Sequence, residues 1–205
     1  MHQKQIAQVY DQKAREYNAD RQGLADNKYI KRFEEILKPQ SLVLDLGCGD
    51  GSVVAAPLLK LNHLVIGLDI SPIQIDLAKK NCPRGEFICR DITALEPEDY
   101  QVDGVTALYS IFHTPRDQHA QLINTIASFL PVGGALLVTM GDREFEGWHE
   151  FYGAKVWSSH FGPQTNSRLV REAGFQIILD ELHTSNRETH QVILAKKINI
   201  YHTLD

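Results

Sequence analysis

The chain has 205 residues, 43% of them hydrophobic and 23% charged, and it carries a formal net charge of −5. This length and composition are typical of one globular domain with a core of its own. The acidic balance argues against a partner that is held by its phosphates, so we expect no nucleic acid. The polar start, Met1 to Tyr10, lacks the apolar core of a signal peptide. No stretch approaches the roughly 18 apolar residues of a membrane span, so we expect no membrane partner. We expect a cytoplasmic protein, as a monomer or a homodimer.

Cysteine usage also bears on the compartment. Cys48, Cys82 and Cys89 are odd in number and contain no Cys-x-x-Cys pair. We expect buried free thiols, which are typical of a reducing compartment. A metal site would need a cluster of side chains at ligand spacing, and the sequence has none. We therefore predict no metal.

The first predicted strand ends in a glycine-rich turn. Residues 42–51 read Leu-Val-Leu-Asp-Leu-Gly-Cys-Gly-Asp-Gly, with an acid at Asp45 and glycines at alternate positions after it. Glycine tolerates positive φ and lets the backbone approach a ligand closely. A helix is expected to open at Ser52, whose hydroxyl can cap it. Open α/β sheets bind ligands at this edge, so the turn predicts a cofactor site. Asp45 would repel a pyrophosphate and attract a positive group.

Strands and helices alternate along the next ninety residues. Ser71-Pro72-Ile73-Gln74 reads as a capping box, with Ser71 as N-cap and proline at the first helical position. A second capped helix is expected to open at 114–117, because apolar residues recur at helical spacing as far as Leu130. Four strands are expected after the first, at 64–70, 87–89, 102–109 and 135–140.

The periodicity changes after Gly141. Residues 141–164 have no clean period, and we expect a functional loop or one that carries short helices of its own. A helix then ends at Gly174, and strands follow at 175–182 and 191–196. Two strands with no helix between them pair as a hairpin, so the last strand should run antiparallel. The sequence therefore predicts an α/β fold with a seven-stranded, mostly parallel sheet and an antiparallel terminal strand.

Acids in or after the first three strands complete a family pattern. The Asp-x-Gly-x-Gly-x-Gly run at 45–51, Asp69 about 20 residues beyond the glycines and Asp91 together resemble class I S-adenosylmethionine-dependent methyltransferases. The resemblance covers nearly the whole chain. It implies a Rossmann-like three-layer sandwich and S-adenosylmethionine as cofactor, with S-adenosylhomocysteine as product. The cofactor-binding residues that it implies are Asp45, Gly47, Cys48, Gly49, Asp69, Ile70, Asp91, Ile92, Tyr109 and Ser110.

The resemblance also implies a role for each acid. Asp45 would hold the ammonium group, and Asp69 would accept hydrogen bonds from both ribose hydroxyls. Asp91 would accept one from the adenine amino group, while Ile92 N–H would meet a ring nitrogen and Ile70 would cover one face of the base. Plainer alternatives exist, because glycine-rich turns also serve phosphates and an Asp after a strand often caps a helix.

A second resemblance lies at the N-terminus. Residues 9–17 (Val-Tyr-Asp-x-x-Ala-x-x-Tyr) look like the leading helix of small-molecule methyltransferases, including those of quinone biosynthesis. In that group the helix forms part of a lid over the cofactor. Tyr10, Ala14 and Tyr17 share one helix face, and the alternative is that this face merely packs on the sheet. Arg21 follows one turn later, as a candidate for a substrate anion or as a solvated arginine.

Candidates for catalysis and for the acceptor pocket come later in the chain. His113 follows the fourth strand and is the candidate general base, with a structural or cofactor-lining histidine as the alternative. Trp157 and His160 are the expected pocket-lining residues of the aromatic segment 151–161. His190 is a further candidate, against a plain sheet-edge histidine.

The predicted function is methyl transfer to a small molecule at O, N, S or C by in-line displacement. One domain is expected, with N-terminal lid helices at 1–40, a cofactor-binding half at 41–140, a substrate and lid insertion at 141–164, and a helix and terminal hairpin at 165–205. A methyltransferase of RNA, DNA or protein is an alternative, although 109–112 lacks the proline pair of enzymes that methylate base nitrogens. A non-catalytic cofactor binder is another. A nucleotide-dependent dehydrogenase is disfavoured by Asp45 and by the terminal hairpin.

Overall fold

The computed structural model describes residues 2–21, 28–185 and 188–199 of this α/β chain. The strands are β1 (Leu42–Leu46), β2 (Leu64–Asp69), β3 (Glu86–Cys89), β4 (Gly104–Ala107), β5 (Ala135–Gly141), β6 (Phe145–Phe151), β7 (Ala154–His160), β8 (Phe175–Ser185) and β9 (Glu188–Lys197). The helices are α1 (His2–Arg21), α2 (Lys28–Glu34), α3 (Ala55–Lys60), α4 (Pro72–Asn81), α5 (His119–Phe129) and α6 (Pro163–Glu172). Short 3-10 helices are η2 (Ile92–Ala94), η3 (Ile111–His113) and η4 (Arg116–Gln118).

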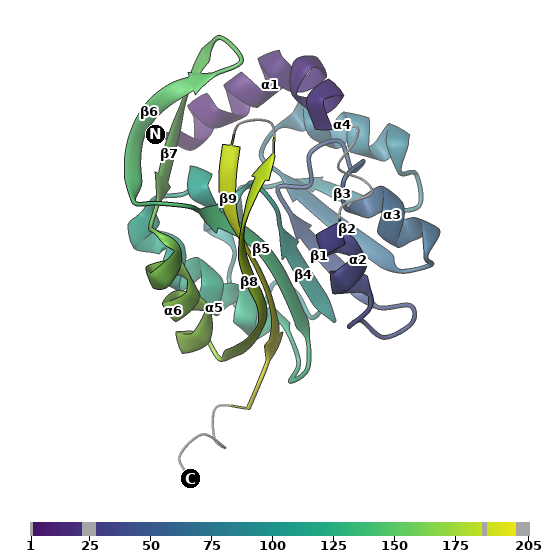
Figure 1. The fold of residues 1–205 in the computed structure, drawn as a ribbon. Helices are drawn as coiled ribbons and strands as arrows, with labels where there is room; N and C mark the ends of the chain where they lie inside the picture. The colour runs from purple at the N-terminus through teal and green to yellow at the C-terminus, as the bar shows by residue number, and fades with distance from the viewer. Residues whose placement is uncertain (1, 22–27, 186–187, 200–205) are drawn as a thin grey trace.

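One sheet of seven strands organises the molecule, in the order β3-β2-β1-β4-β5-β9-β8 (Figure 1). The pairs from β3 to β5 are all parallel, whereas β9 runs antiparallel to both β5 and β8. The predicted fold class is therefore confirmed, with its antiparallel terminal strand. Strands β2 and β3 are added on one side of β1, and β4 and β5 on the other. Sheets of this kind bind ligands at the point beside β1 where the strand order switches.

Two apolar clusters cover the two faces of this sheet. Neighbouring residues of a strand point to opposite faces, so Val43 and Leu44 of β1 join different clusters. The Val43 cluster includes apolar residues of α2, α3 and α4, and the Leu44 cluster includes those of α5 and α6. Both residues are completely buried, as a central parallel strand requires. The result is a helix–sheet–helix sandwich, as Figure 1 shows.

The segment after β5 is a β-hairpin, so the expectation of a loop or short helices at 141–164 is wrong. β6 and β7 pair antiparallel in a separate two-stranded sheet, with Trp148 opposite Trp157. Tyr152 and Gly153 join them with φ of 49° and 73°. Positive φ at both residues is typical of the tight turn that matches strand twist. Exposure alternates along β6, which is the half-buried pattern of a strand. Figure 1 shows the hairpin beside the N-terminal half of α1.

Helix starts agree with the sequence in one place and differ in two. Ser71 caps α4 as predicted and accepts a hydrogen bond from Gln74 N at 3.1 Å. The expected start at Ser52 is wrong, because both the N–H and the hydroxyl of Ser52 donate to Asp50 and α3 begins only at Ala55. The helix expected at 114–117 is preceded by η4, and α5 begins at His119.

The cysteines are free, but they are not all buried. Cys48 and Cys82 are buried, whereas Cys89 is exposed, which corrects the expectation for that residue. Cys89 lies on β3, the edge strand of the sheet, so one side of its strand has no neighbour. Among the residues that the structure describes, no helix combines the length and the apolar character that crossing a membrane requires.

Candidate functional site

Three neighbouring cavities lie at the carboxyl ends of the parallel strands, and Tyr109 lines all of them. The first cavity, of about 70 Å³, lies between the ends of β2, β3 and β4 and helix α1. The turn cavity, of about 30 Å³, lies at the glycine turn, and the second cavity, of about 300 Å³, lies beside the β6–β7 hairpin. Tyr109 follows β4 with φ of 58°, a rare conformation for a side chain of this size, and such strained residues cluster at functional sites.

The glycine turn between β1 and α3 brings backbone to the edge of the first cavity. Gly47 has φ of +81°, and a Cβ there would lie 2.5 Å from the Cβ of Ser110. Gly49 has φ of +54°, and a Cβ there would meet nothing within 4 Å. Gly47 therefore permits the close approach of the turn to Ser110, whose hydroxyl donates to Leu46 O at 2.7 Å. Gly49 borders open space, where a ligand can lie directly on the backbone.

Asp45 is a buried carboxyl group with one unpartnered oxygen. Its Oδ1 accepts a hydrogen bond from the Thr106 hydroxyl at 2.7 Å, whereas Oδ2 has no partner among the described residues. The side chain lines the turn cavity together with Gly47, Cys48 and Gly49. Burial raises the pKa of Asp45 to about 7. A buried carboxylate with a free oxygen suits a cation such as an ammonium group and opposes a phosphate.

Asp69, at the end of β2, is fixed by the backbone of two loops. Its Oδ1 accepts from Ser71 N and its Oδ2 from Gly49 N, both at 2.9 Å. Burial raises the pKa of Asp69 to about 6. Each carboxylate oxygen has a second lone pair, so this group can still accept hydrogen bonds from a diol in the first cavity.

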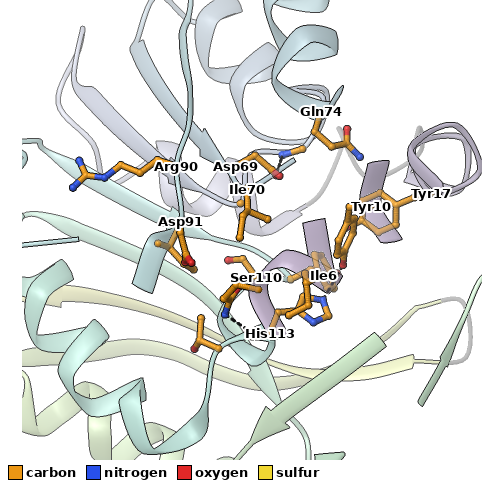
Figure 2. Close-up of a pocket in the computed structure, with 16 residues that line it drawn as sticks. Ile6, Tyr10, Tyr17, Asp69, Ile70, Gln74, Arg90, Asp91, Ser110 and His113 are labelled. Carbon is orange, nitrogen blue, oxygen red and sulfur yellow. Dashed lines mark hydrogen bonds between the residues drawn. The ribbon is translucent and has the colours of Figure 1, made fainter. Parts of the chain in front are cut away.

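The third predicted acid has a structural role as well as a place in the cavity. Asp91 accepts from the N–H and the hydroxyl of Thr93 at 2.9 and 2.8 Å, so it caps η2, as the plainer alternative has it. It also lines the first cavity together with Ile70 and Ile92. Figure 2 shows Asp69, Ile70 and Asp91 on one side of this cavity and Ile6 and Tyr10 of α1 on the other.

Helix α1 covers the first cavity. Gln3, Ile6, Tyr10 and Tyr17 all line it, and the rings of Tyr10 and Tyr17 meet edge to face at 5.1 Å. Ala14, on the same face, is buried. Arg21 ends the helix, and its side chain lies outside the described part of the structure.

Hydrogen bonds at several points hold α1 in place. Ser71, the cap of α4, donates its hydroxyl to Asp11 at 2.5 Å, and Gln3 donates to the carbonyl of His113 at 3.1 Å. Asn18 and Gln74 exchange two side-chain hydrogen bonds, at 3.1 and 3.2 Å. The side chain of Gln74 is therefore used on α1 and does not reach back to Ser71 as in a full capping box.

His113 lies between the first and second cavities, with both ring nitrogens in hydrogen bonds. Nδ1 is 3.1 Å from Trp157 O, and Nε2 is 2.8 Å from the Tyr10 hydroxyl. A carbonyl only accepts, so Nδ1 carries the proton and Nε2 accepts the hydrogen bond from Tyr10. His113 thereby joins α1, η3 and β7. Its predicted role as a base stays a prediction.

The second cavity has aromatic and histidine walls. His160, expected to line a pocket, does line it, and its Nδ1 donates to Arg143 O at 2.6 Å. His190 also lines it and stacks on Phe112 with ring centroids 5.3 Å apart. Trp157, also expected to line a pocket, is not among the described residues that line this cavity or the first, although its carbonyl accepts from His113. Lining residues of this cavity that sequence reasoning did not single out include Phe112, Asp142, Arg143, Phe145, His149, Glu188 and Thr189.

A metal centre is not part of this arrangement in the described residues. No group of three or more His, Cys, Asp or Glu side chains is placed to hold a metal ion there, although several histidines surround the second cavity. The site can therefore orient two molecules in adjoining cavities, with Tyr109 at the junction. The first cavity and the turn cavity together offer a buried carboxyl group with an unpartnered oxygen, Asp45, and a second carboxyl group, Asp69, that can accept further hydrogen bonds.

Comparison with known proteins points to one domain family. Residues 43–134 match the family model described as a methyltransferase domain. The chain is 30% identical over 125 residues to the ubiquinone biosynthesis O-methyltransferase of Coxiella burnetii, which covers 59% of this chain and 51% of that protein. It is 32% identical over 141 residues to the trans-aconitate 2-methyltransferase of Methylobacterium radiotolerans, an alignment that covers 66% of this chain and 53% of that protein. The chain thus spans about half the length of these curated relatives.

A solved structure shares the fold over most of both chains. Magnesium protoporphyrin IX methyltransferase from Synechocystis PCC 6803, solved with bound SAH, aligns with a TM-score of 0.69. The alignment covers 87% of this chain and 84% of that one, at 19% sequence identity. At this identity the likeness concerns the fold.

Proposed function

Since residues 43–134 match the methyltransferase domain model, we propose that the protein transfers the methyl group of S-adenosylmethionine to a small-molecule acceptor. The observation that carries the proposal is the unpartnered, buried Oδ2 of Asp45 beside the glycine turn. S-adenosylmethionine carries an ammonium group and no phosphate, so it satisfies this oxygen. A dinucleotide would bring its pyrophosphate to the same turn and be repelled.

The remaining cofactor contacts follow from the geometry of the first cavity. Asp69 would accept from both ribose hydroxyls, because its position is fixed by Gly49 N and Ser71 N. Ile70, Asp91 and Ile92 would hold the adenine. When bound, S-adenosylmethionine supplies a methyl group on a sulfonium sulfur, which is already activated for displacement. The protein therefore needs to orient the acceptor and exclude water, and α1 supplies cover for the second task.

The acceptor would occupy the second cavity. Its volume of about 300 Å³ is at the lower end of the range for small-molecule sites. It shares Tyr10, Tyr109 and His113 with the first cavity, so the two ligands would meet there. A second, separate cavity supports an enzyme over a protein that only binds the cofactor. We also propose the cytoplasm as its location, which the free thiols support.

The test is calorimetric titration of the purified protein with S-adenosylmethionine, S-adenosylhomocysteine and NAD. We expect both sulfur compounds to bind with micromolar affinity and NAD not to bind. Absence of binding by either sulfur compound would refute the proposal, and tight NAD binding would favour a dehydrogenase. Methyl transfer from radiolabelled S-adenosylmethionine to a panel of small acceptors then tests catalysis, with bulk RNA and protein in parallel as the alternative acceptors.

A further inference from the structure

We propose that His160 is the catalytic base for an aromatic hydroxyl acceptor bound in the second cavity, an inference that rests on the proposed function. His160 is the last residue of β7 and lines this cavity. The proposal names both the residue that takes the proton and the chemical class of the acceptor. Three observations support it: the fixed position of the imidazole ring, the lone pair on its Nε2, and the aromatic and charged residues that line the cavity.

The ring of His160 is held against bare backbone. Gly141 ends β5, and a Cβ on it would lie 2.0 Å from Nδ1 and 2.3 Å from Cγ of His160. Only glycine leaves room for the ring in this position. The Nδ1–H donates to the carbonyl oxygen of Arg143 at 2.6 Å, which fixes the rotation of the ring. The imidazole is therefore fixed at the carboxyl edge of the sheet, beside the ends of the parallel strands.

The hydrogen bond of Nδ1 fixes the tautomer of His160, in which the lone pair is on Nε2. Since Nδ1 donates to a carbonyl, the neutral ring has its free electron pair on Nε2. The backbone of Phe161 also interacts with the ring, but no described side chain forms a hydrogen bond with Nε2. Burial lowers the pKa of His160, so the ring is neutral at pH 7. Among its neighbours, the backbone of Arg143, the charge of Asp142 and the backbone of Phe161 raise this pKa, whereas the charge of Arg143 lowers it. Buried His119 has a pKa lowered to about 4 and carries no charge.

Three other histidines line the cavity: the ring of His190 is stacked on Phe112, and the other two already use Nε2 in a hydrogen bond. His113 Nε2 accepts from the Tyr10 hydroxyl at 2.8 Å. His149 Nε2 lies 2.8 Å from the hydroxyl of Ser158. An acceptor would have to displace a protein partner from either atom, whereas Nε2 of His160 needs no such exchange.

The walls and charges of the cavity favour a flat, uncharged acceptor. Phe112 and His190 present a stacked pair, and Tyr109, Phe145 and Phe151 add aromatic surface. Aromatic side chains bind flat rings by offset or edge-on contacts.

The described charged residues of the lining are two acids, Asp142 and Glu188, and one base, Arg143. The guanidinium of Arg143 already pairs with Asp142 at 3.1 Å. An acceptor with several carboxylates would therefore lack a counter-charge, whereas a phenol-type hydroxyl needs none. A hydroxyl does need a base, because it is a poor nucleophile while it keeps its proton.

The proposed methyl transfer conserves atoms and charge. The acceptor oxygen attacks the methyl carbon while its proton moves to Nε2 of His160. The new O–C bond forms as the C–S bond breaks, and the electron pair of that bond stays on sulfur. The products are a methyl ether, a neutral thioether and the imidazolium of His160, which then loses its proton to solvent. No oxidant or reductant is needed.

The first test is independent of turnover. Protein saturated with S-adenosylhomocysteine, whose binding the calorimetry establishes separately, is titrated with 4-nitrophenol and with 4-nitrobenzoate, at a pH below the pKa of 4-nitrophenol so that its hydroxyl keeps its proton. Binding is followed by visible absorbance for the phenol, by calorimetry for both probes, and by the ¹⁵N resonance of His160 Nε2. We expect 4-nitrophenol to bind and shift this resonance, and 4-nitrobenzoate to bind at least about tenfold more weakly, a difference of about 1.4 kcal/mol.

The variants separate a base from a structural histidine. His160→Gln should weaken 4-nitrophenol binding about fivefold, the loss expected for one hydrogen bond. Gly141→Ala should abolish the ¹⁵N shift, because its Cβ displaces the ring without removing it. The matched control is His63→Gln, since His63 lies just before β2, at the opposite end of the parallel strands from the cavity, and it should leave probe binding unchanged.

Turnover gives the second test, once a phenol acceptor is found in the panel. His160→Gln should lower kcat by roughly 100-fold to 10,000-fold, the usual contribution of a general base, with cofactor affinity unchanged. The proposal is overturned if 4-nitrophenol does not bind or binds with the Nε2 resonance unmoved. It is also overturned if 4-nitrobenzoate binds as tightly as the phenol, or if the variant keeps a normal kcat. Loss of cofactor binding by the parent protein would instead refute the proposed function.

Discussion

The glycine turn after β1 and the hairpin after β5 border adjoining cavities, yet they are built in different ways. The turn uses backbone groups and acids at the ends of neighbouring strands, such as Asp45 and Asp69, and these are fixed by hydrogen bonds to Thr106 and to backbone N–H groups. The cavity beside the hairpin uses side chains from α1, η3, β5, β6, β7 and β9. The donor side, meaning the turn cavity and the first cavity where the methyl donor would bind, therefore depends on local geometry. The acceptor side, meaning the second cavity, depends on how distant segments pack.

The largest expected effect tests the donor side at Gly47. Gly47→Ala combines a left-handed backbone with a Cβ placed 2.5 Å from that of Ser110. We expect it to lower the free energy of unfolding by about 2–5 kcal/mol, the sum of backbone strain and overpacking. Urea unfolding measures this loss, and cofactor binding should be lost with it.

Gly49→Ala is the matched control for that change. It has the same left-handed backbone but no atom within 4 Å of the added Cβ. The expected loss of stability is about 1–2 kcal/mol, from backbone strain alone. Equal losses in the two variants would contradict the idea that Ser110 fixes the turn.

The next effect concerns the charge of Asp45. Asp45→Asn keeps the shape and the hydrogen bond with Thr106 but removes the negative charge. We expect affinity for S-adenosylmethionine to fall by about 1.5–3 kcal/mol, which is about ten- to a hundredfold in Kd. The stability of the cofactor-free protein should not fall, since a buried charge is removed. Asp76→Asn, on the exposed side of α4, is the control and should change neither quantity.

The same carboxyl group predicts a pH dependence. Burial raises the pKa of Asp45 to about 7, so lowering the pH through that value protonates it and weakens its attraction for an ammonium group. Affinity should fall by up to about tenfold per pH unit below pH 7. In Asp45→Asn, calorimetry between about pH 5 and pH 8 should give a flatter profile.

The stability of the cofactor-free protein should change in the opposite direction. The folded-state pKa of Asp45 lies above the ordinary value of 3.8, so its contribution to stability is full below that value and is lost as the pH rises through about 7. Burial also raises the pKa of Asp69, to about 6, which adds a change of the same sign. A cofactor-free protein whose stability rises across this range in the parent but not in Asp45→Asn would contradict the assignment.

The smallest effect tests the acceptor side. Tyr10→Phe keeps the ring contacts with Tyr17 and Phe151 but removes the hydrogen bond to His113. We expect a loss of about 0.5–1.5 kcal/mol, together with faster hydrogen exchange in α1. A double-mutant cycle with His113→Ala should show coupling of about 0.5–1 kcal/mol. Additive losses would mean that this bond does not help to hold α1.

Sequence reasoning identified the residues around the glycine turn that lie together, because their signals are local; their roles toward a cofactor stay predictions. The glycine run, the cap at Ser71 and the acids at 45, 69 and 91 each lie within a few residues of the turn that they serve. Strand order followed from the alternation of elements and from the terminal hairpin. The helix start at Ser52 failed because the Ser52 hydroxyl donates to Asp50, two residues earlier, and does not cap a helix.

The second cavity was predicted only in part, because the residues that meet there are distant in the chain. His113 bonds to Tyr10, 103 residues away, and to Trp157, 44 residues away. The hairpin itself had a readable signal, the alternation along 145–151 followed by Tyr152-Gly153, which the aromatic and histidine-rich composition obscured. The exposure of Cys89 depends on which strand lies at the sheet edge, and no local pattern states this.

Helix α1 has a consequence for the speed of the proposed reaction. Gln3, Ile6, Tyr10 and Tyr17 line the first cavity, so a molecule that fills it touches this helix. The spent cofactor then dissociates no faster than α1 moves away, and that movement breaks the hydrogen bonds to Ser71 and His113. Residence time of the product, set by those few bonds, would limit turnover whenever methyl transfer itself is fast. Loosening the helix would then raise kcat even as it weakens cofactor binding.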